Sequence, residues 1–405
     1  MRKNFHRLLL LATLIGACDL AFNSRGAVHV AAWGAGKFVA SPFDSFNLGQ
    51  SIVPGDLTTN AVFIAGGQWH SSALRTDGTI ESWGSDSVNQ IGGSVGLSNL
   101  IAVAAGGLHG LALNSDTTVT AWGDDRFGQV EAPPNLSNVV AIAGGFYHSM
   151  ALKSDGTVAA WGTSTNPADI GKDPSYGQAI VPTNLANVVA ISAGGWHCLA
   201  LKSDGTATGW GRDNFNQADV PPGLSNIVAI AAGGVHSMAL LANGTVMVWG
   251  DNTYQQTNVP AGLSNVVAIA AGGWHCLALK ADGTVTAWGA GTTNSNTNLV
   301  FGQNVVPVGL TNVAQIAGGW YHSLALVESG PPVLGVQLTN PGRDTNGFHV
   351  MLPTRSGRVY RLEYKNSLTD SNWTALPLVA GVAGMQELND PTAAGTTRFY
   401  RVRHW

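Results

Sequence analysis

Short apolar runs, each about the length of one strand, alternate with glycine-containing turns along most of the chain. Residues 265–289, "NVVAIAAGGWHCLALKADGTVTAWG", show the pattern once. The apolar runs Val266 to Ala270, His275 to Leu279 and Val285 to Trp288 have the length and composition of buried strands. Asp282-Gly283 is a hairpin signal between the second and third runs. The pattern predicts a small sheet that must pack against similar sheets to bury both of its faces.

The unit recurs along the chain, and several residue types mark it. A histidine followed by an apolar run recurs at His70, His109, His148, His197, His236, His275 and His322. A glycine stands three residues before each histidine, at Gly67, Gly106, Gly145, Gly194, Gly233, Gly272 and Gly319. Trp-Gly recurs at Trp33, Trp83, Trp122, Trp161, Trp210, Trp249 and Trp288. A glutamine recurs at Gln50, Gln90, Gln129, Gln178, Gln217, Gln256 and Gln303. These markers predict seven copies of one structural unit.

The copies are evenly spaced apart from two insertions. Successive histidines lie 39 residues apart, except for steps of 49 and 47 residues. The extra residues fall near 163–175 and 290–300. Insertions in repeat proteins normally map to surface loops, so we expect the sheets themselves to be undisturbed.

The unit, with the Gly-Gln that follows it, resembles the repeat of the regulator of chromosome condensation family. The resemblance covers roughly Val28 to Val327 and implies a seven-bladed β-propeller with four strands in each blade. The sequence departs from the repeat at Asn243-Gly244 and Asp116-Thr117, where Asp-Gly is expected. Asn-Gly serves the same turn, whereas Asp-Thr is expected to need a different loop.

The two ends of the repeat region complement each other. Trp33 opens the array without a Gly/His half before it, and the half around His322 has no Trp-Gly after it. We therefore expect the N-terminal strand, Val28 to Trp33, to pair with the strand after His322. Pairing of this kind closes the ring and leaves no unpaired sheet edge.

The N-terminus is predicted to be a signal peptide, residues 1–27. Arg2, Lys3 and Arg7 precede an apolar run from Leu8 to Ala17, which is too short for a permanent membrane span. "IGAC", ending at Cys18, resembles a bacterial lipoprotein processing box, in which Cys18 would be lipidated. The alternative is an ordinary signal cut nearer Ala27. Either reading predicts an exported bacterial protein, outside the cell, on its surface or in the periplasm, with no membrane attachment except a lipid on Cys18.

The propeller, residues 28–329, is acidic. From Val28 to Leu334 there are 8 Lys and Arg against 18 Asp and Glu. Binding to a phosphate backbone needs a basic surface, so we expect no nucleic acid partner. Cys198 and Cys276 hold equivalent positions in two blades that are separated by one full blade. This distance is too long for a disulfide, so both are predicted to be buried free thiols.

The repeat ends at a linker, residues 330–334, which contains Gly330-Pro331-Pro332. "GFHVMLP", "RVYRLEYK", "WTALPLV" and "RFYRVRHW" follow and alternate like strands. Residues 335–405 resemble small β-sandwich domains at the ends of exported bacterial proteins. Such a domain aids secretion or surface retention, or is a plain packing module.

No set of residues predicts catalysis or a cofactor. Equivalent histidines of successive blades are too far apart to share a metal, and we expect each ring to bond backbone inside its own blade. Gly92 to Gly96 matches G-x-S-x-G, but no strand–turn–helix surrounds the match. Asp86, Asp125, Asp213 and Asp251 follow Trp-Gly pairs and form either an acidic rim or turn caps.

One set of residues predicts binding. Two residues before each repeat glutamine stand Leu48, Val88, Phe127, Tyr176, Phe215, Tyr254 and Phe301. Phe127, Tyr176, Phe215, Tyr254 and Phe301 are aromatic and lie in loops at one face of the disc. Either each ring packs on its own blade, or the rings form a binding surface of the kind enriched in interface hot spots.

Three functions are compatible with these patterns. The first is an exported, monomeric, non-catalytic protein that binds a protein or glycan on one propeller face, as the secreted bacterial members of the family bind and inhibit enzymes. The second is nucleotide exchange on a small GTPase, the activity of the founding type, which the signal peptide disfavours. The third is an enzyme acting on polysaccharide, which would need paired carboxylates or a metal. Fold alone does not choose among them.

Overall fold

The computed structural model describes the chain from Val28 to Trp405 with several gaps. The described residues are 28–36, 48–58, 60–163, 174–291, 301–328, 339–344, 347–354, 357–367, 369–370, 372–382, 384–393 and 398–405. The predicted signal peptide with Cys18, the linker at 330–334 and most of both insertions lie outside them.

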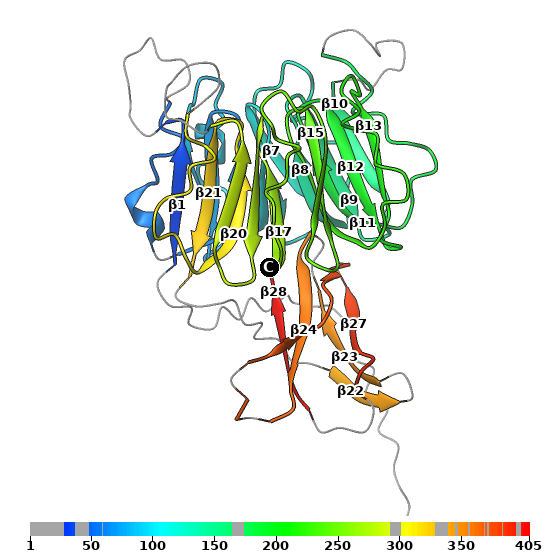
Figure 1. The fold of residues 1–405 in the computed structure, drawn as a ribbon. Coiled ribbons are helices and arrows are strands. Elements are labelled where there is room, and N and C mark those ends of the chain that lie inside the picture. The colour runs from blue at the N-terminus through cyan, green and yellow to red at the C-terminus, as the bar shows by residue number, and fades with distance from the viewer. Residues whose placement is uncertain are drawn as a thin grey trace, which may run out of the picture.

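Seven three-stranded sheets stand side by side around an axis and form the blades of a propeller (Figure 1). The inner strands are β2 (Ala61–Gly66), β5 (Leu100–Ala105), β8 (Val139–Gly144), β11 (Val188–Ala193), β14 (Ile227–Ala232), β17 (Val266–Ala271) and β20 (Val313–Gly318). The middle strands each begin at a repeat histidine: β3 (His70–Arg75), β6 (His109–Asn114), β9 (His148–Lys153), β12 (His197–Lys202), β15 (His236–Leu241), β18 (His275–Lys280) and β21 (His322–Val327). The outer strands each end at Trp-Gly: β4 (Ile80–Gly84), β7 (Val119–Gly123), β10 (Val158–Gly162), β13 (Ala207–Gly211), β16 (Val246–Gly250), β19 (Val285–Gly289) and β1 (His29–Gly34).

The all-β, seven-bladed fold predicted from the repeat is confirmed, but the described residues of each blade form three strands rather than four. The segment after the repeat glutamine, where a fourth strand would run, contains Pro133-Pro134 in one blade and Pro221-Pro222 in another. Proline has no N–H to donate to a ladder, so these segments follow the blade without joining its sheet. The other regular elements of the described propeller are two 3₁₀ turns, η1 (Gly55–Thr58) and η2 (Gly92–Ser94). Neither of these described turns is long and apolar enough to cross a membrane.

The N-terminal strand closes the ring as predicted. β1 pairs antiparallel with β21, from His29 opposite Val327 to Gly34 opposite His322. Trp33 is completely buried, and its Nε1–H donates to the Gln303 carbonyl at 2.8 Å. Across the seam, the Gln315 side chain accepts the Ile64 N–H and donates to the Ile64 carbonyl, both at 3.2 Å. The ring is thus closed by backbone pairing of β1 within the last blade and by the Gln315 side chain, which joins the last blade to the first.

The hairpin between β6 and β7 differs from the structure that the sequence predicted. Thr117 takes the place of a turn glycine with φ of 70°, close to the 77° of Gly78 in the neighbouring blade. Its N–H donates to the Asn114 carbonyl at 3.0 Å, as that of Gly78 does to Arg75. The expectation of a different loop at Asp116-Thr117 is therefore wrong: the turn is kept, with a β-branched residue in a left-handed conformation.

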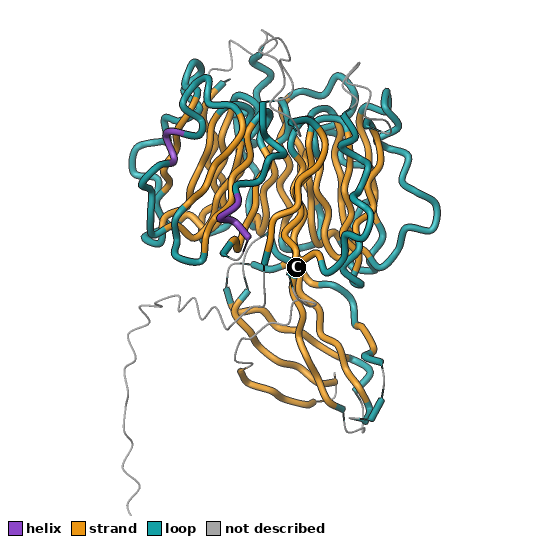
Figure 2. Tube along the Cα trace, turned by 90° about the vertical axis from the view of Figure 1, so that its left-hand side faces the viewer, coloured by secondary structure: helices purple, strands orange, loops and turns teal. Residues whose placement is uncertain are grey.

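The C-terminal residues form two small sheets below the propeller (Figures 1 and 2). One sheet has the order β22 (Thr339–Asp344), β23 (Gly347–Pro353), β27 (Met385–Asp390). In the other, β24 (Val359–Lys365) pairs with β25 (Thr374–Ala375), β26 (Val379–Ala380) and β28 (Phe399–His404). Val350, Leu362 and Val402 belong to a core shared by the two sheets.

This C-terminal unit packs against the lower face of the propeller. The Leu378 N–H donates to the Ala242 carbonyl, in a hairpin of the β14–β16 blade, at 3.0 Å. Leu378 and Trp405 are buried in one cluster with Val267 of the propeller. The lower face is therefore occupied, and the opposite face, which we call the top face, is the end at which the middle strands begin (Figure 1).

Candidate binding face

A buried layer of polar side chains lies beneath the top face. The Nε2 of His109 lies 2.9 Å from the hydroxyl of Ser149 in the next blade, and that hydroxyl donates to the Gln129 carbonyl at 2.8 Å. The Nε1–H of Trp161 donates to the same carbonyl at 3.0 Å. The repeat histidine, tryptophan and glutamine thus form one cluster at each blade junction, which we call the histidine layer.

The contact of the histidine crosses between blades. In the described residues Nε2 of every repeat histidine except His70 contacts a Ser or Cys side chain of the following blade, whereas we expected a backbone partner inside the same blade. The pairs, besides His109–Ser149, are His148–Cys198, His197–Ser237, His236–Cys276, His275–Ser323 and His322–Ser71. The structural role of the histidines therefore consists in joining neighbouring blades. No three His, Cys, Asp or Glu side chains of the described residues lie close enough to share a metal ion.

These histidines are neutral in the folded protein. Burial lowers the pKa of His148 to about 3 and that of His236 to about 4. Each serine hydroxyl has one proton, and Ser149 donates it to the Gln129 carbonyl. The hydroxyl oxygen must therefore accept a hydrogen bond from the histidine, so the histidine carries its proton on Nε2. Cys198 and Cys276 are free and buried, as predicted, and burial raises the pKa of each thiol well above its ordinary value.

His70 is the exception in the layer. The next blade has Gly110 where the other blades have Ser or Cys, and neither ring nitrogen of His70 has a hydrogen-bond partner. A Cβ at Gly110 would lie 2.3 Å from Cζ2 of Trp122. The Trp122 indole therefore occupies the space that a Ser or Cys side chain fills in the other blades.

The repeat glutamines connect the histidine layer to the loops of the top face. The Gln129 side-chain carbonyl accepts the Phe127 N–H at 2.9 Å, and Gln217 accepts that of Phe215 at 2.9 Å. The same bond recurs at Leu48, Val88, Tyr176, Tyr254 and Phe301. A buried glutamine thus fixes the loop that presents each predicted aromatic residue.

These five aromatic residues differ in exposure. Phe127 and Phe215 are 37% and 43% exposed, and Tyr176 and Tyr254 are half-buried. Phe301 is only 2% exposed and packs against Tyr321 with ring centroids 5.6 Å apart. Four of the five therefore reach the surface, and Phe301 supports it from beneath.

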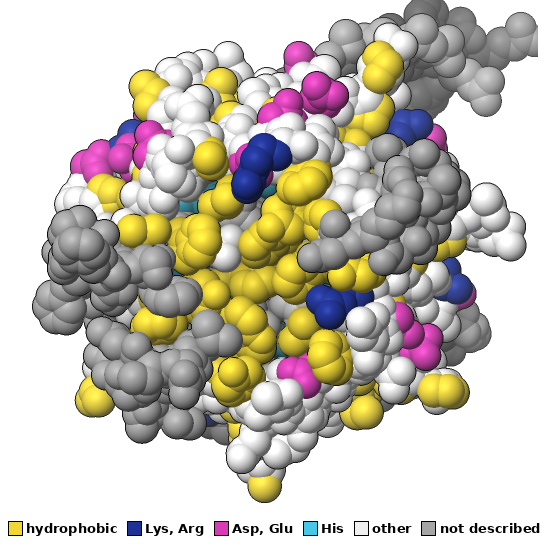
Figure 3. Space-filling model, turned by 90° about the horizontal axis from the view of Figure 1, so that it is seen from above, with side chains coloured by type: hydrophobic (Ala, Val, Ile, Leu, Met, Phe, Trp, Pro, Cys, Tyr) yellow, Lys and Arg dark blue, Asp and Glu magenta, His cyan; other side chains and the backbone are white. Residues whose placement is uncertain are grey.

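An inner ring of side chains, which our sequence analysis missed, lies beside them. It consists of the residue before each repeat histidine: Trp69, Leu108, Tyr147, Trp196, Val235, Trp274 and Tyr321. Phe127 meets Tyr147 edge to face at 4.9 Å, and Tyr254 meets Trp274 at 6.5 Å. The fixed distance from the histidine was a signal that could have revealed this ring. Seen from above, apolar side chains cover the middle of the top face, with acidic side chains nearer the rim (Figure 3).

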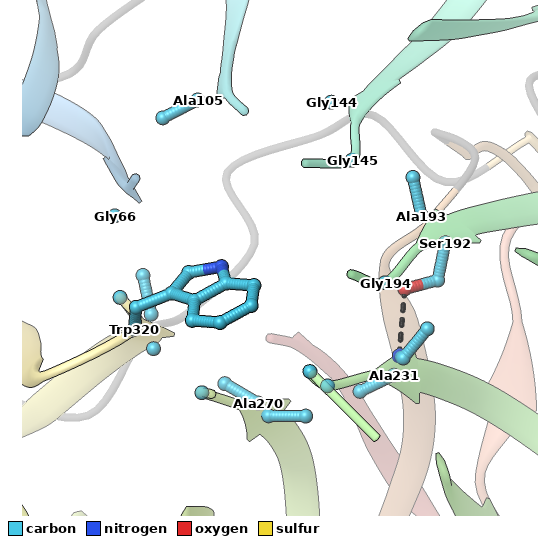
Figure 4. Close-up of a pocket in the computed structure, with 18 of the residues that line it drawn as sticks. Gly66, Ala105, Gly144, Gly145, Ser192, Ala193, Gly194, Ala231, Ala270 and Trp320 are labelled. Atoms are coloured by element: carbon cyan, nitrogen blue, oxygen red, sulfur yellow. Dashed lines mark hydrogen bonds between the residues drawn. The ribbon is translucent and has the colours of Figure 1, made fainter. Parts of the chain in front are cut away.

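Two further aromatic residues cover the centre. Phe146 and Trp320 stand two residues before a histidine, where four of the other blades have glycine. Their rings meet edge to face at 4.6 Å, and Trp320 also contacts Trp196 and Trp274. Below them is a central cavity of about 270 Å³, lined mainly by glycine and alanine from the inner strands (Figure 4). The lining has no charged side chain among the described residues, so chemistry on the top face would have to come from its loops.

The loop aspartates cap turns, the simpler of the two readings given above. Asp86 accepts the Ile91 and Gly92 N–H groups, and Asp213 accepts those of Ala218 and Asp219. The G-x-S-x-G serine, Ser94, is buried in η2 and donates to the Ile91 carbonyl at 2.7 Å. It lies in a 3₁₀ turn and not at the strand–turn–helix elbow that the motif requires.

The comparisons with known proteins agree with this architecture. A sequence profile of the regulator of chromosome condensation (RCC1) repeat matches residues 100–129, 139–166, 188–217, 227–256 and 266–296. No curated protein sequence matches the chain.

Similar solved structures share the fold at low sequence identity. Yeast RCC1 (Prp20) in complex with Kap60 is 20% identical with a TM-score of 0.58, covering 81% of this chain and 97% of that one. Prp20p from Saccharomyces cerevisiae is 21% identical with a TM-score of 0.57, covering 75% and 92%. Human WBSCR16 is 19% identical with a TM-score of 0.52, covering 76% and 100%. Five of the seven repeats are thus regulator of chromosome condensation (RCC1) repeats, and the ring of seven sheets has the fold of these solved structures.

Proposed function

We propose that the protein is exported and acts as a non-catalytic binding protein that holds a protein partner on its top face. The observation that carries the proposal is the continuous, partly exposed aromatic surface made by the inner ring, its central pair and the outer loops. Aromatic residues are enriched in the hot spots of protein interfaces, and contiguous apolar patches are uncommon on monomers. The basic and apolar N-terminal segment supports export.

The position of the face also supports a protein partner. The C-terminal unit occupies the lower face, whereas the top face is broad and carries no cover from the described residues. One relative of this fold, Prp20p, has described binding properties to Gsp1p and histones. A broad, shallow aromatic surface suits a folded protein better than a small molecule, which needs a concave site.

Capture on variants of the face tests the proposal. Immobilised protein is incubated with the exported proteins of its own source, and each retained protein is quantified. We expect a retained protein to be reduced about tenfold or more by the double variant Phe127→Ala/Phe215→Ala, the loss typical of hot spots. Met247→Ala, which removes a 41% exposed side chain from β16, is the control and should change nothing. Retention that is equal in both variants would refute the proposal.

A further inference from the structure

One position of the top face differs in charge between blades. The residue after each Trp-Gly is Ala35, Ser85, Asp124, Thr163, Arg212, Asp251 or Ala290. Two blades thus have a carboxylate at this place, and one has a guanidinium.

Where the residue is an aspartate, its carboxylate has partners within the blade. The Gln129 side-chain amide donates to Asp124 at 2.8 Å, and Gln256 donates to Asp251 at the same distance. Asp124 also holds Arg126, whose Nε lies 2.7 Å from a carboxylate oxygen. Both carboxylates therefore have hydrogen-bond donors inside their blades, and Asp124 also has a positive partner.

Arg212 is surrounded by aromatic rings instead of a carboxylate. The guanidinium carbon lies 5.1, 5.2 and 5.9 Å from the ring centroids of Tyr176, Trp196 and Phe215. None of the ion pairs among the described residues includes Arg212. The neighbouring acid, Asp213, instead accepts backbone N–H groups of its own loop.

The donors around Arg212 are also unsatisfied. Its Nε, the Nε1 of Trp196 and the side-chain nitrogen of Gln217 are all buried without a hydrogen-bond partner. The side-chain nitrogen of Gln90 likewise lacks a hydrogen-bond partner, but the equivalent residue in that blade, Ser85, carries no charge. The Arg212 blade is the one that combines unpartnered donors with a cation and three aromatic rings.

We propose that Arg212 binds a carboxylate, namely the acidic side chain of a protein partner, at an aromatic-framed site on the top face. The inference rests on the proposed function and deepens it. A guanidinium presents a planar fork that matches a carboxylate in two parallel hydrogen bonds. The three rings displace part of the water around the half-buried guanidinium, which strengthens an ion pair formed there. One guanidinium outside the ion pairs of the described residues, on an acidic propeller, suits a single carboxylate better than a phosphate-rich partner.

Small probes test the site without the partner. Benzoate carries a carboxylate on an apolar ring, and benzamide is its neutral counterpart. We expect benzoate to shift the Nε–H resonance of Arg212 saturably, and benzamide to bind about tenfold more weakly, because a charge-assisted pair is lost. Arg212→Met should abolish benzoate binding. Arg126→Met should leave it unchanged, because Asp124 already pairs that guanidinium.

The variant Arg212→Asp separates a binding role from a packing role. It restores the residue found at Asp124 and Asp251, so its carboxylate can accept from Gln217. We expect it to melt no lower than the unmodified protein while losing benzoate binding. Melting well below the unmodified protein would show that Arg212 is a packing residue and overturn the proposal, as would equal binding of benzoate and benzamide.

Partner capture distinguishes this inference from the function on which it rests. If Phe127→Ala/Phe215→Ala abolishes capture and Arg212→Met does not, the binding face stands and the carboxylate site fails. If benzoate binds at Arg212 and no protein depends on the face, the proposed function fails. Glucuronate that binds at least tenfold more tightly than benzoate would assign the site to an acidic glycan and overturn the protein side chain as its ligand.

Discussion

The histidine layer and the aromatic face lie one above the other, yet they differ in how strictly they repeat. In the layer, histidine, tryptophan and glutamine occur in every blade, and the Ser or Cys partner is missing only at Gly110. On the face, the residue before the histidine is Trp, Tyr, Leu or Val, and the residue after Trp-Gly ranges from Asp124 to Arg212. The residues of the layer make the same interblade contacts at nearly every junction, so their identity is restricted. The residues of the face make no repeated contact of this kind, so they vary between blades.

This difference teaches where to look for function in a repeat propeller. A position that repeats strictly and is buried holds the blades together. A position that departs from the repeat at one blade, at a cost in unsatisfied polar groups, is a candidate for recognition. The predictions below test whether stability belongs to the layer and binding to the face.

Removal of the closing strand should have the largest effect. Deletion of Val28 to Gly34 removes β1, its pairing with β21 and the buried Trp33. The ring is left with an open edge, and we expect cooperative unfolding near room temperature or aggregation. Thermal unfolding followed by circular dichroism measures the effect. A deletion variant that melts like the unmodified protein would contradict ring closure by β1.

Acid should unfold the protein through the histidine layer. Burial lowers the pKa of His109, His148, His197, His275 and His322 to about 3, whereas the unfolded chain takes up these protons near pH 6.5. The contribution of the histidines is therefore fully present above pH 6.5 and declines as the pH falls. Each histidine costs about 1.4 kcal/mol per pH unit in that range.

Melting temperatures between pH 8 and pH 4 test the layer. We expect little change above pH 7 and a steep fall below pH 6. The hairpin aspartates lose their contribution only at lower pH, since hydrogen bonds from Thr157 lower the pKa of Asp155 to about 2. A melting temperature that stays constant from pH 7 to pH 5 would show that the histidines are not buried in neutral form.

Two phenylalanines at equivalent positions separate packing from binding. Phe301→Ala removes a ring that is 2% exposed and should cost about 3–5 kcal/mol of unfolding free energy. Phe215→Ala removes a ring that is 43% exposed and should change stability by less than about 1 kcal/mol. Denaturant unfolding of both variants measures the difference. Equal losses would place Phe215 in the core and weaken the binding face.

A single hydroxyl of the layer should cost less than a core ring. Ser149→Ala leaves Nε2 of His109 without its partner and removes one donor from the Gln129 carbonyl. We expect a loss of about 1–3 kcal/mol, the cost of an unsatisfied buried polar group. Ser154→Ala, an exposed serine after the same strand, is the control. Partner capture by Ser149→Ala should be unchanged at temperatures where the variant is folded.

The smallest effect is expected at the turn of the β5–β7 blade. Thr117→Gly relieves a β-branched residue at φ of 70° and should stabilise the protein by about 1 kcal/mol. The same substitution of Thr157, which follows a turn that already has Gly156, should not stabilise. A Thr117→Gly variant that melts lower than the unmodified protein would show that the threonine side chain contributes more than its strain costs.

The sequence by itself determined the seven repeated sheets, the closing strand and the structural use of the histidines and tryptophans, which follow from strand-length apolar runs, hairpin signals and a half-unit at each end of the array. The arrangement of the sheets as a propeller was implied by the resemblance of the repeat to a known family. The sequence also placed Phe127 and Phe215 in loops of one face, because the loop after each Trp-Gly lies at the same end of every blade.

Only the tertiary structure decided which groups meet across blades. The partner of His109 is Ser149, 40 residues away in the next blade, and no local pattern distinguishes that contact from a backbone bond nearby. Phe301 is buried in a cluster with Ala35 and Tyr321, residues that come from opposite ends of the array. The isolation of Arg212 among three rings likewise arises where two blades converge. Such contacts depend on the distance between blades, which is fixed by how the sheets pack around the axis and not by the pattern within one repeat.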